Sequence, residues 1–311
     1  MIIVPYQESN YAEINEFINL VNPKKFINTP KFISYHGDKY EDRSLIIKNE
    51  RSNIIGFFPA SVINEKIISH PGLTFGGLIS SQKRTVDIFK IYDQIIKFYK
   101  KDFKKLIVKL PPPIYLNKQS SVEEAYFLQK EFKISSYYIT SIIDLNNPLP
   151  IFKNKKRNIN KAKKLNNIDV CLNIPFDDVY IKLQKSLSER HNISPTHNLD
   201  ELKLIKDLFP KEIYPIVAVL NNEILAGAII FESGLITHTQ YLFNTNQGMQ
   251  LGALDLVIDK LIQKIKGNSR YLSFGSSSEK HGKYVNMGLL RFKEEFGSTI
   301  QLGKTFELNL T

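Results

Sequence analysis

Cysteine is almost absent from this sequence of 311 residues, which contains a single one, Cys171. One cysteine excludes both an intramolecular disulfide and a thiolate zinc cluster. Cys171 lies in the strand-like stretch Ile168–Ile174 with no histidine beside it. Because a free cysteine is most often a core residue, we expect a structural thiol here rather than a nucleophile.

Long apolar runs are absent as well. The longest, such as Ile213–Leu220 and Ile224–Phe231, have the length of strands, whereas a membrane-spanning helix needs about 20 apolar residues. The first ten residues lack the basic region and apolar core of a signal peptide. The sequence also has no P-loop, Rossmann fingerprint, Gly-x-Ser-x-Gly elbow or metal triad. We therefore expect a cytoplasmic protein without membrane insertion and without a metal.

Positive charge dominates, with a net charge of +11. Nucleic acid is the first partner that such a charge suggests. However, the lysines are spread along a chain rich in Lys, Ile and Asn, and concentrate only at Lys153–Lys164. A basic cleft of this kind also suits phosphate-bearing small molecules such as coenzyme A and nucleotide sugars. We expect those ligands rather than nucleic acid. The sequence does not specify an oligomeric state.

The length predicts two domains, since a domain usually has about 100–200 residues. The Pro- and Asn-containing segment Asn146–Pro150 gives the boundary, with domains at 1–148 and 149–311. Each half is expected to contain helices, antiparallel strands, a glycine-bearing loop, a helix and a further strand, which is an α/β class with mixed α+β sheets. In the second half we expect a meander of three strands followed by the loop Asn244–Gly252 and the helix Ala253–Lys266.

This order of elements resembles the acyl-CoA half of the GNAT fold. The stretch NMGLLRFKEEFGSTIQLGKTFEL at Asn286–Leu308 resembles the end of a Fem-type transferase domain, and the basic helix Lys153–Lys164 resembles the start of that domain. The resemblance implies two GNAT-like domains in tandem, as in FemAB-like proteins of the sugar N-acyltransferase branch. The chain lacks the coiled-coil arm of some Fem-type enzymes, which favours acyl-CoA over aminoacyl-tRNA as the donor.

The resemblance also implies a coenzyme A site. The expected loop opens a helix, whose free N–H groups and positive dipole end suit the pyrophosphate. The strand Ile224–Phe231 is expected to offer its edge to the pantetheine amides, with Gly227 as a bulge or a tight packing contact. The candidate cofactor-binding residues are Gln247, Gly248, Gln250, Gly252, Ala253 and Gly227.

Acyl transfer to an amine needs a polarised carbonyl and a path for one proton. By resemblance, Lys293 in FKEEFG lies at the acyl site, where a cation would stabilise the oxyanion; otherwise it is a solvated helix lysine. His238, His197 and Glu279 are candidate bases, although a strand histidine is more often a core group. The candidate substrate-binding residues are Arg157, Lys161, Tyr241, Ser276 and Phe292. The two cations are assigned to an acceptor diphosphate or, equally, to a solvated helix face.

Together these patterns predict an acyl-CoA-dependent N-acyltransferase. Its acceptor is expected to be the amino group of a nucleotide-linked amino sugar, such as a dTDP-3-amino-3,6-dideoxyhexose, used in lipopolysaccharide O-antigen or another surface polysaccharide. Transfer would be direct, in a ternary complex. One alternative is a Fem-type transferase that uses aminoacyl-tRNA and a peptidoglycan precursor. Another is a non-catalytic RNA-binding protein, for which affinity would fall steeply with salt.

Overall fold

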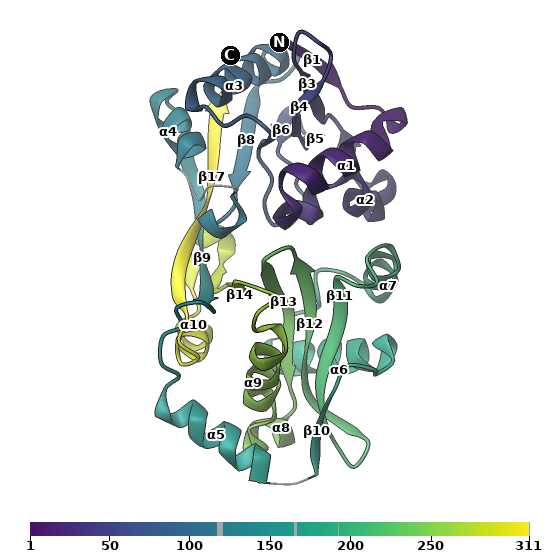
Figure 1. Cartoon of the computed structure of the whole chain (residues 1–311), viewed down its shortest axis with the longest axis vertical. Helices are drawn as coiled ribbons and strands as arrows, with labels where there is room; N and C mark the ends of the chain where they lie inside the picture. The colour runs from purple at the N-terminus through teal and green to yellow at the C-terminus, as the bar shows by residue number, and fades with distance from the viewer. Residues whose placement is uncertain (117–120, 165–166, 192, 311) are drawn as a thin grey trace. The chain divides into compact units, whose positions relative to one another are not determined.

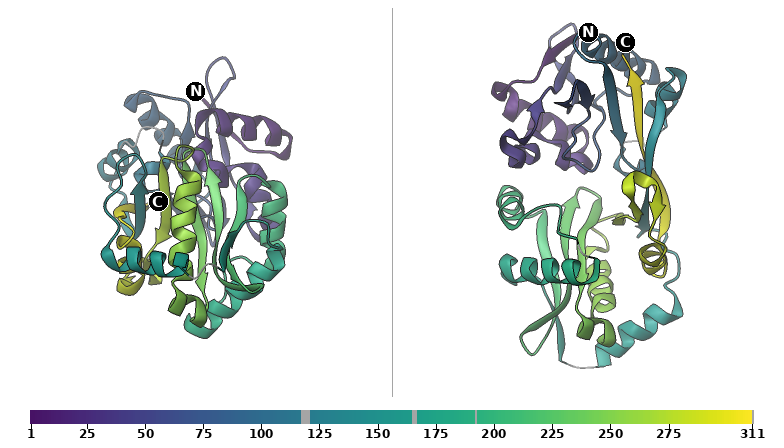
Figure 2. Two further views of the ribbon diagram at one scale, coloured as in Figure 1. Left: turned by 60° about the horizontal axis from the view of Figure 1, so that its bottom comes forward. Right: turned by 180° about the vertical axis from the view of Figure 1, so that it is seen from behind.

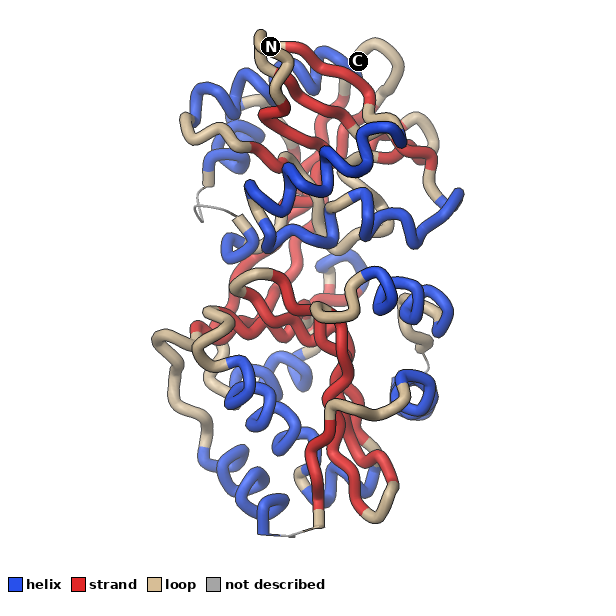
Figure 3. The backbone as a smooth tube through the Cα atoms, turned by 45° about the vertical axis from the view of Figure 1, so that its right-hand side comes forward, coloured by secondary structure: helices blue, strands red, loops and turns tan. Residues whose placement is uncertain are grey.

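The computed structural model describes residues 1–116, 121–164, 167–191 and 193–310. The predicted class is confirmed, because helices flank mixed sheets in both parts of the chain (Figures 1 and 3). The chain divides into two compact units. Unit 1 comprises Met1–Ile139, Ser278–Val285 and Gln301–Thr311, and unit 2 comprises Thr140–Ser277 and Asn286–Ile300.

These units do not follow a single cut of the chain. Strand β17 (Thr299–Asn309) pairs antiparallel with β8 (Lys105–Leu110), through the partners Lys304 to Asn309. It also carries Phe306 into the core of unit 1. The expected boundary between residues 148 and 149 stays a prediction. It does not account for β17, the C-terminal strand that belongs to unit 1, because no local sequence pattern indicates that pairing.

Unit 1 contains two sets of strands covered by helices. One set has the order β1 (Ile2–Pro5), β3 (Leu45–Lys48), β4 (Ile54–Phe58) and β7 (Ile79–Ser80). The other has the order β17, β8, β6 (Lys66–Ile68), β5 (Ser61–Ile63) and β2 (Glu41–Asp42). The α-helices are α1 (Tyr11–Val21), α2 (Pro30–Ile33), α3 (Thr85–Tyr99) and α4 (Val122–Gln129). Buried aromatic side chains, among them Phe58, Tyr92 and Phe127, hold the main core together.

Unit 2 is built on one sheet. Its strands follow the order β10 (Ile168–Cys171), β11 (Ile213–Leu220), β12 (Glu223–Ser233), β13 (Ile236–Asn244), β14 (Tyr271–Ser276) and the end of β9 (Lys133–Asp144). The helices are α5 (Lys153–Lys164), α6 (Phe176–His191), α7 (Leu199–Leu208), α8 (Asn246–Leu251), α9 (Ala253–Ile265) and α10 (Met287–Glu294). Helices α6 and α9 pack on opposite faces of β11–β13 (Figures 1 and 2).

The predicted meander is confirmed in β11, β12 and β13, which are antiparallel neighbours. The first turn is formed by Asn221 and Asn222, both at positive φ (49° and 66°). Two successive residues at positive φ are what the common two-residue hairpin turn requires, and asparagine tolerates that conformation. The local sequence therefore determines this hairpin.

The expected loop Asn244–Gly252 is wrong, because residues 246–251 form helix α8. Thr245 caps this helix, since its Oγ1 accepts the N–H of Gly248 at 3.0 Å. Gly252, at φ +75°, ends α8 and leads directly into α9. A threonine at the N-cap and a left-handed glycine at the C-cap are typical of a short helix. The sequence-based expectation took Gly248 and Gly252 as loop residues instead.

The expected free edge at β12 is also wrong. This strand lies between β11 and β13, and Gly227 pairs with Val217 on one side and with Phe243 on the other. A Cβ atom on Gly227 would come within 2.7 Å of Val217 Cγ1 and 2.8 Å of the Phe243 ring. Gly227 therefore serves packing, since its missing side chain leaves room for Phe243.

Gly227→Ala should lower the free energy of unfolding by about 1–3 kcal/mol, because Phe243 has to move. Gly288→Ala is the matched control, since a Cβ there would meet only Asn286 Oδ1, at 3.5 Å. Its helical position should make it neutral or stabilising by up to about 1 kcal/mol. Urea unfolding followed by circular dichroism measures both variants, and equal stabilities would contradict the packing role.

Candidate active site

Strands β13 and β14 separate in the middle of unit 2. They are parallel and pair only at Ile236–His238 with Tyr271–Ser273, although β13 continues to Asn244 and β14 to Ser276. Opposite β12, the register of β13 also shifts, which leaves Gln240 as an extra residue. Such a bulge redirects side chains and is common beside functional sites. The sheet therefore opens just after His238.

Lys293 of α10 satisfies backbone groups at this opening. Its side chain is 2% exposed, and Nζ donates to the carbonyl oxygens of Gly275 at 3.0 Å and Ser276 at 2.7 Å. Both carbonyls belong to the part of β14 that has left β13. Burial lowers the pKa of Lys293 to about 7. The lysine is therefore not a solvated helix residue, and it changes charge near neutral pH.

His238 lies beside this lysine. Its Nδ1 is 3.1 Å from Ser273 Oγ, and a Cβ atom on Gly275 would come within 2.9 Å of its Cε1. Burial, followed by the positive charge of Lys293, lowers the pKa of His238 to about 4. The imidazole is thus neutral at physiological pH. Ser273 and Gly275 belong to this cluster, although the sequence did not single them out, and the parallel register of β13 and β14 brings Ser273 opposite His238.

His197 and Tyr241 form a second hydrogen-bonded pair in unit 2. His197 is 7% exposed, its Nδ1 is 2.7 Å from the Tyr241 hydroxyl, and its backbone N–H donates to that hydroxyl at 3.1 Å. Burial is the main cause that raises the pKa of Tyr241. The Gln240 side chain lies close enough to influence the pKa of both His238 and Tyr241. The bulged residue therefore lies near both His238 and Tyr241, the partner of His197.

Helix α5 covers the start of α9, where the pyrophosphate site was expected. A Cβ atom on Gly252 would come within 2.7 Å of the Asn158 carbonyl oxygen. In the first turn of α9, Asp255 accepts from Lys155 Nζ at 3.0 Å and from Asn158 Nδ2 at 2.9 Å. The chain's own carboxylate thus meets the positive end of the helix dipole. This arrangement leaves little attraction for a bound phosphate there.

A cavity of about 330 Å³ lies beside this contact and against the end of β13. Its lining is mostly apolar, and Gly252 and Phe292 both contribute to it. The ammonium group of Lys155 lies 4.2 Å from the centroid of the Phe292 ring, so the lysine is held by a carboxylate and by an aromatic face at once. The lining residues are Lys155, Asn158, Ser186, Leu187, Leu242, Phe243, Asn244, Met249, Gly252, Leu254, Asp255, Leu289 and Phe292.

The remaining predicted residues are not gathered in one place. Lys161 donates to the Gln250 carbonyl at 2.7 Å. The side chains of Gln247, Gln250 and Arg157 are exposed, whereas Gly248 and Ala253 are buried. Glu279 is exposed and belongs to unit 1, in the short strand β15 (Ser278–Glu279) that pairs with β16 (Tyr284–Val285).

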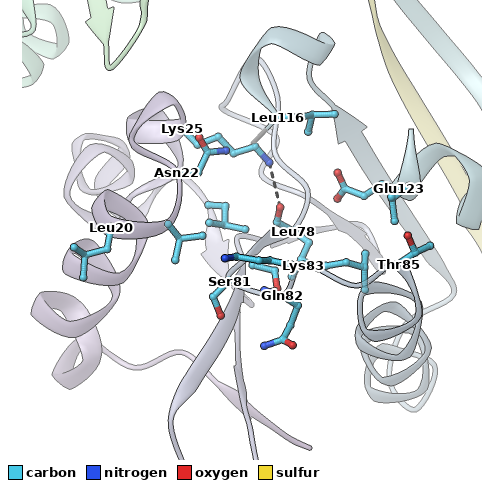
Figure 4. A pocket seen from close by; sticks show the side chains of 15 residues that line it. Leu20, Asn22, Lys25, Leu78, Ser81, Gln82, Lys83, Thr85, Leu116 and Glu123 are labelled. Atoms are coloured by element: carbon cyan, nitrogen blue, oxygen red, sulfur yellow. Dashed lines mark hydrogen bonds between the residues drawn. The ribbon is translucent and has the colours of Figure 1, made fainter. Parts of the chain in front are cut away.

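Unit 1 has a cavity of about 580 Å³ that none of the predicted residues lines. Figure 4 shows Lys25 reaching the Leu78 carbonyl, with Lys83 below and Glu123 across the opening. Lys25 is 1% exposed and donates to the carbonyls of Gly76 and Leu78, both at 3.2 Å. Burial lowers its pKa. These bonds tie Lys25 to the backbone beside this cavity.

Within the described residues, no group of three or more His, Cys, Asp or Glu side chains could hold a metal ion. No helix in the described part of the chain has the length and apolarity needed to cross a membrane.

No family model matches the sequence, and no curated protein is similar enough to count as a relative. The structure itself defines the class: the chain has the fold of Fem-like proteins, with GNAT-like units in tandem. It is similar to FemX, with a TM-score of 0.72, 11% identity and coverage of 99% of this chain and 97% of that one.

Two further solved structures share this fold. The C-terminal domain of a protein described as a lysylphosphatidylglycerol synthetase, from Agrobacterium fabrum, gives a TM-score of 0.62 at 10% identity, covering 97% and 92% of the two chains. A tandem GNAT protein from the clavulanic acid biosynthesis pathway, solved without acetyl-CoA, gives 0.56 at 8% identity, covering 100% and 98%. At these identities the likeness concerns the fold.

Lys293→Met should change how stability depends on pH. Between about pH 7 and the ordinary lysine pKa of 10.5, the unfolded chain binds a proton at this position that the folded protein does not. The free energy of unfolding should therefore rise with pH in the wild type relative to the variant, by about 1.4 kcal/mol per pH unit. Below pH 7 the difference should be constant.

Urea unfolding at a series of pH values measures this difference. Lys161→Met is the matched control, since Lys161 is exposed and also donates to a backbone carbonyl. Its stability curve should run parallel to that of the wild type. A parallel curve for Lys293→Met would show that the pKa of Lys293 is not lowered.

Proposed function

We propose that this protein transfers an acyl group from an activated donor to an amine at the opening between β13 and β14. One observation carries this proposal: a buried lysine and a neutral histidine lie together where two parallel strands separate. The buried cation has two of its donors fixed by the backbone. The likeness to FemX and to a tandem GNAT protein supports the same class of reaction.

In the proposed step, the amine nitrogen attacks the carbonyl carbon of a thioester. A C–N bond forms and the C–S bond breaks, and the leaving thiolate ends as a thiol with the proton lost by the amine. Lys293 in its protonated form would stabilise the negative charge on the carbonyl oxygen, and burial strengthens that interaction. His238 is a weak base at its lowered pKa, so we assign it a positioning role through Ser273.

We further propose acyl-CoA as the donor and a nucleotide-linked amino sugar, such as a dTDP-3-amino-3,6-dideoxyhexose, as the acceptor for surface polysaccharide. Two features support this choice. The apolar cavity beside Phe292 has the character that a pantetheine arm or acyl chain needs. The net charge of +11 favours polyanionic substrates of both kinds.

A second candidate is an aminoacyl donor of the Fem type. The observation in its favour is the contact of α5 with the start of α9, which places Asp255 where a coenzyme A pyrophosphate would bind. An aminoacyl donor that binds at another place on the protein does not need the N-terminal end of α9.

Incubation with radiolabelled donors separates the two candidates. We expect label from acetyl-CoA or a longer acyl-CoA to appear on a dTDP-linked amino sugar, and calorimetry to detect acyl-CoA binding. Label transferred only from aminoacyl-tRNA, to a peptidoglycan precursor, would overturn the first candidate and support the second. RNA binding that falls steeply with salt, with no transfer from any donor, would overturn both.

Lys293→Met should lower kcat by about a hundred- to thousand-fold, because one oxyanion donor contributes roughly 3–4 kcal/mol. The KM of each substrate should change little, since the interaction forms only in the transition state. Lys161→Met, which removes another lysine bonded to a carbonyl, should keep nearly the wild-type kcat. Steady-state kinetics measures both variants, and a wild-type kcat for Lys293→Met would return that lysine to a purely structural role.

Cys171→Ser should leave turnover within a few-fold of wild type. Direct transfer needs no enzyme thiol, and Cys171 is half-buried on the outer strand β10, paired with Val217. Mass spectrometry of the protein after incubation with donor alone is the accompanying measurement. An acyl group found on Cys171 would replace direct transfer with a covalent intermediate.

A further inference from the structure

Unit 1 contains a cavity of about 320 Å³ that the transfer chemistry does not use. It lies between the segment after β1, the start of α1, the end of α2 and strand β4. Its volume is within the range of small-molecule sites. The lining residues are Tyr6, Gln7, Glu8, Tyr11, Pro30, Ile33, Ser34, His36, Gly37, Tyr40, Asp42, Phe57 and His70.

Three rings form one wall of this cavity. The imidazoles of His36 and His70 stack with their centroids 5.0 Å apart and a tilt of 30°. The Tyr40 ring meets both edge-on, at 5.1 Å and 5.4 Å. A Cβ atom on Gly72 would overlap both His36 and Tyr40. The absence of a side chain at Gly72 thus permits this wall.

His70 is held in an unusual state within the wall. Its φ is +64°, a conformation that costs energy for a residue with a Cβ atom. The side chain is 1% exposed, and among the described residues its Nδ1 has no hydrogen-bond partner. Burial, followed by the nearby His36 and Lys109, lowers the pKa of His70 to about 3, so the ring is neutral. Such a nitrogen needs a partner that the described residues do not supply, and a bound ligand can provide one.

The charge around the cavity is negative, in contrast to the chain as a whole. Glu8 and Asp42 line it, and no lysine or arginine is among the lining residues. Burial, followed by the charges of Asp42 and Glu8, raises the pKa of Tyr6 to about 12, which places both carboxylates near that hydroxyl. Lys39 lies 5.7 Å from the centroid of the Tyr40 ring without lining the cavity.

Two further cations lie near the cavity residues: Arg43, which is close to Asp42 and pairs with Glu41, and Lys109, which is occupied by the backbone. Its Nζ donates to the carbonyls of Pro71 at 3.1 Å and Leu73 at 2.9 Å. The cavity therefore combines two carboxylates and several aromatic faces with no cation of its own in the lining. Carboxylates attract a cation by charge, and aromatic faces attract it through their quadrupoles.

We propose that this cavity of unit 1 is a second ligand site, which binds the ammonium group of a small amine between Glu8, Asp42 and the rings of Tyr40 and His70. The site does not depend on the proposed transfer reaction, because its residues lie in unit 1 and form their own enclosure. An amine of the size of an amino sugar or a short diamine fits its volume.

Isothermal calorimetry with four probes tests this site. Glucosamine and agmatine carry the ammonium or guanidinium charge, whereas N-acetylglucosamine and glucose lack it. We expect both charged probes to bind at least about tenfold more tightly than the neutral ones. If glucosamine binds more tightly than agmatine, the natural ligand is a hydroxylated ring amine, and the reverse order identifies an aliphatic amine; either order supports the site.

The double variant Glu8→Gln/Asp42→Asn should weaken the charged probes by about tenfold or more. Glu13→Gln/Glu16→Gln is the matched control, because both residues are exposed on α1, outside the lining, and the net charge changes equally. Its affinity should match the wild type. The melting temperature confirms that each variant is folded.

A nuclear magnetic resonance titration reports on His70 itself. Glucosamine should shift the His70 imidazole nitrogen signals, which are assigned by their loss in His70→Asn, and N-acetylglucosamine should not. The proposal is overturned if neither charged probe binds below about 10 mM, if the neutral sugars bind equally well, or if the two double variants behave alike. These assays need no acyl donor, so their failure leaves the transfer reaction untouched.

Discussion

The separation of two parallel strands is the constraint on which unit 2 depends. After three paired positions, β13 and β14 part, and the carbonyl oxygens of Gly275 and Ser276 in β14 need other donors. Lys293 supplies them from α10, and the helix is itself fixed by Asn286, whose side chain accepts the N–H of Leu289. The same bonds that keep the sheet open also hold a cation at its opening. One side chain therefore has this structural role together with the chemical role that we propose for it.

The basic helix α5 shows how a run of like charges is divided. Lys155 is buried against Asp255 and the Phe292 ring, Lys161 bonds the end of α8, and Lys163 pairs with Asp259 at 2.7 Å. These lysines lock α5 onto α8 and α9. Arg157 is exposed instead. Several cations of this basic stretch therefore bind α5 to the neighbouring helices. Only the exposed ones, such as Arg157, are available to a ligand.

Local sequence patterns predicted those parts of the fold that depend on neighbouring residues in the chain. The hairpin at Asn221–Asn222 follows from its turn residues, and the alternation of helices and strands from periodicity. The helix α8 was missed because two glycines outweighed the threonine that caps it. For the site, the resemblance selected Lys293, and composition selected His238 and His197. The contact of His238 with Ser273 depends on strand register, which a single sequence does not specify.

The wall of His36, Tyr40 and His70 escaped prediction for a related reason. Its rings come from segments about thirty residues apart in sequence, with a glycine making room between them. Histidines scattered along a chain are usually unremarkable. Only the spatial arrangement, together with the unpaired nitrogen, separates this pair from ordinary core residues.

The return of β17 to β8 has a consequence for how the chain reaches its structure. Lys304 pairs with Leu110, so the ladder that completes unit 1 joins residues separated by nearly the whole of unit 2 in sequence. During synthesis the early strands of unit 1 remain without their last neighbour until the residues of unit 2 have emerged, and that exposed edge is vulnerable to association with other chains. Forming such a distant contact is also slow, because a long loop has to close first. The two units are therefore coupled in time: the first to begin folding is the last to finish.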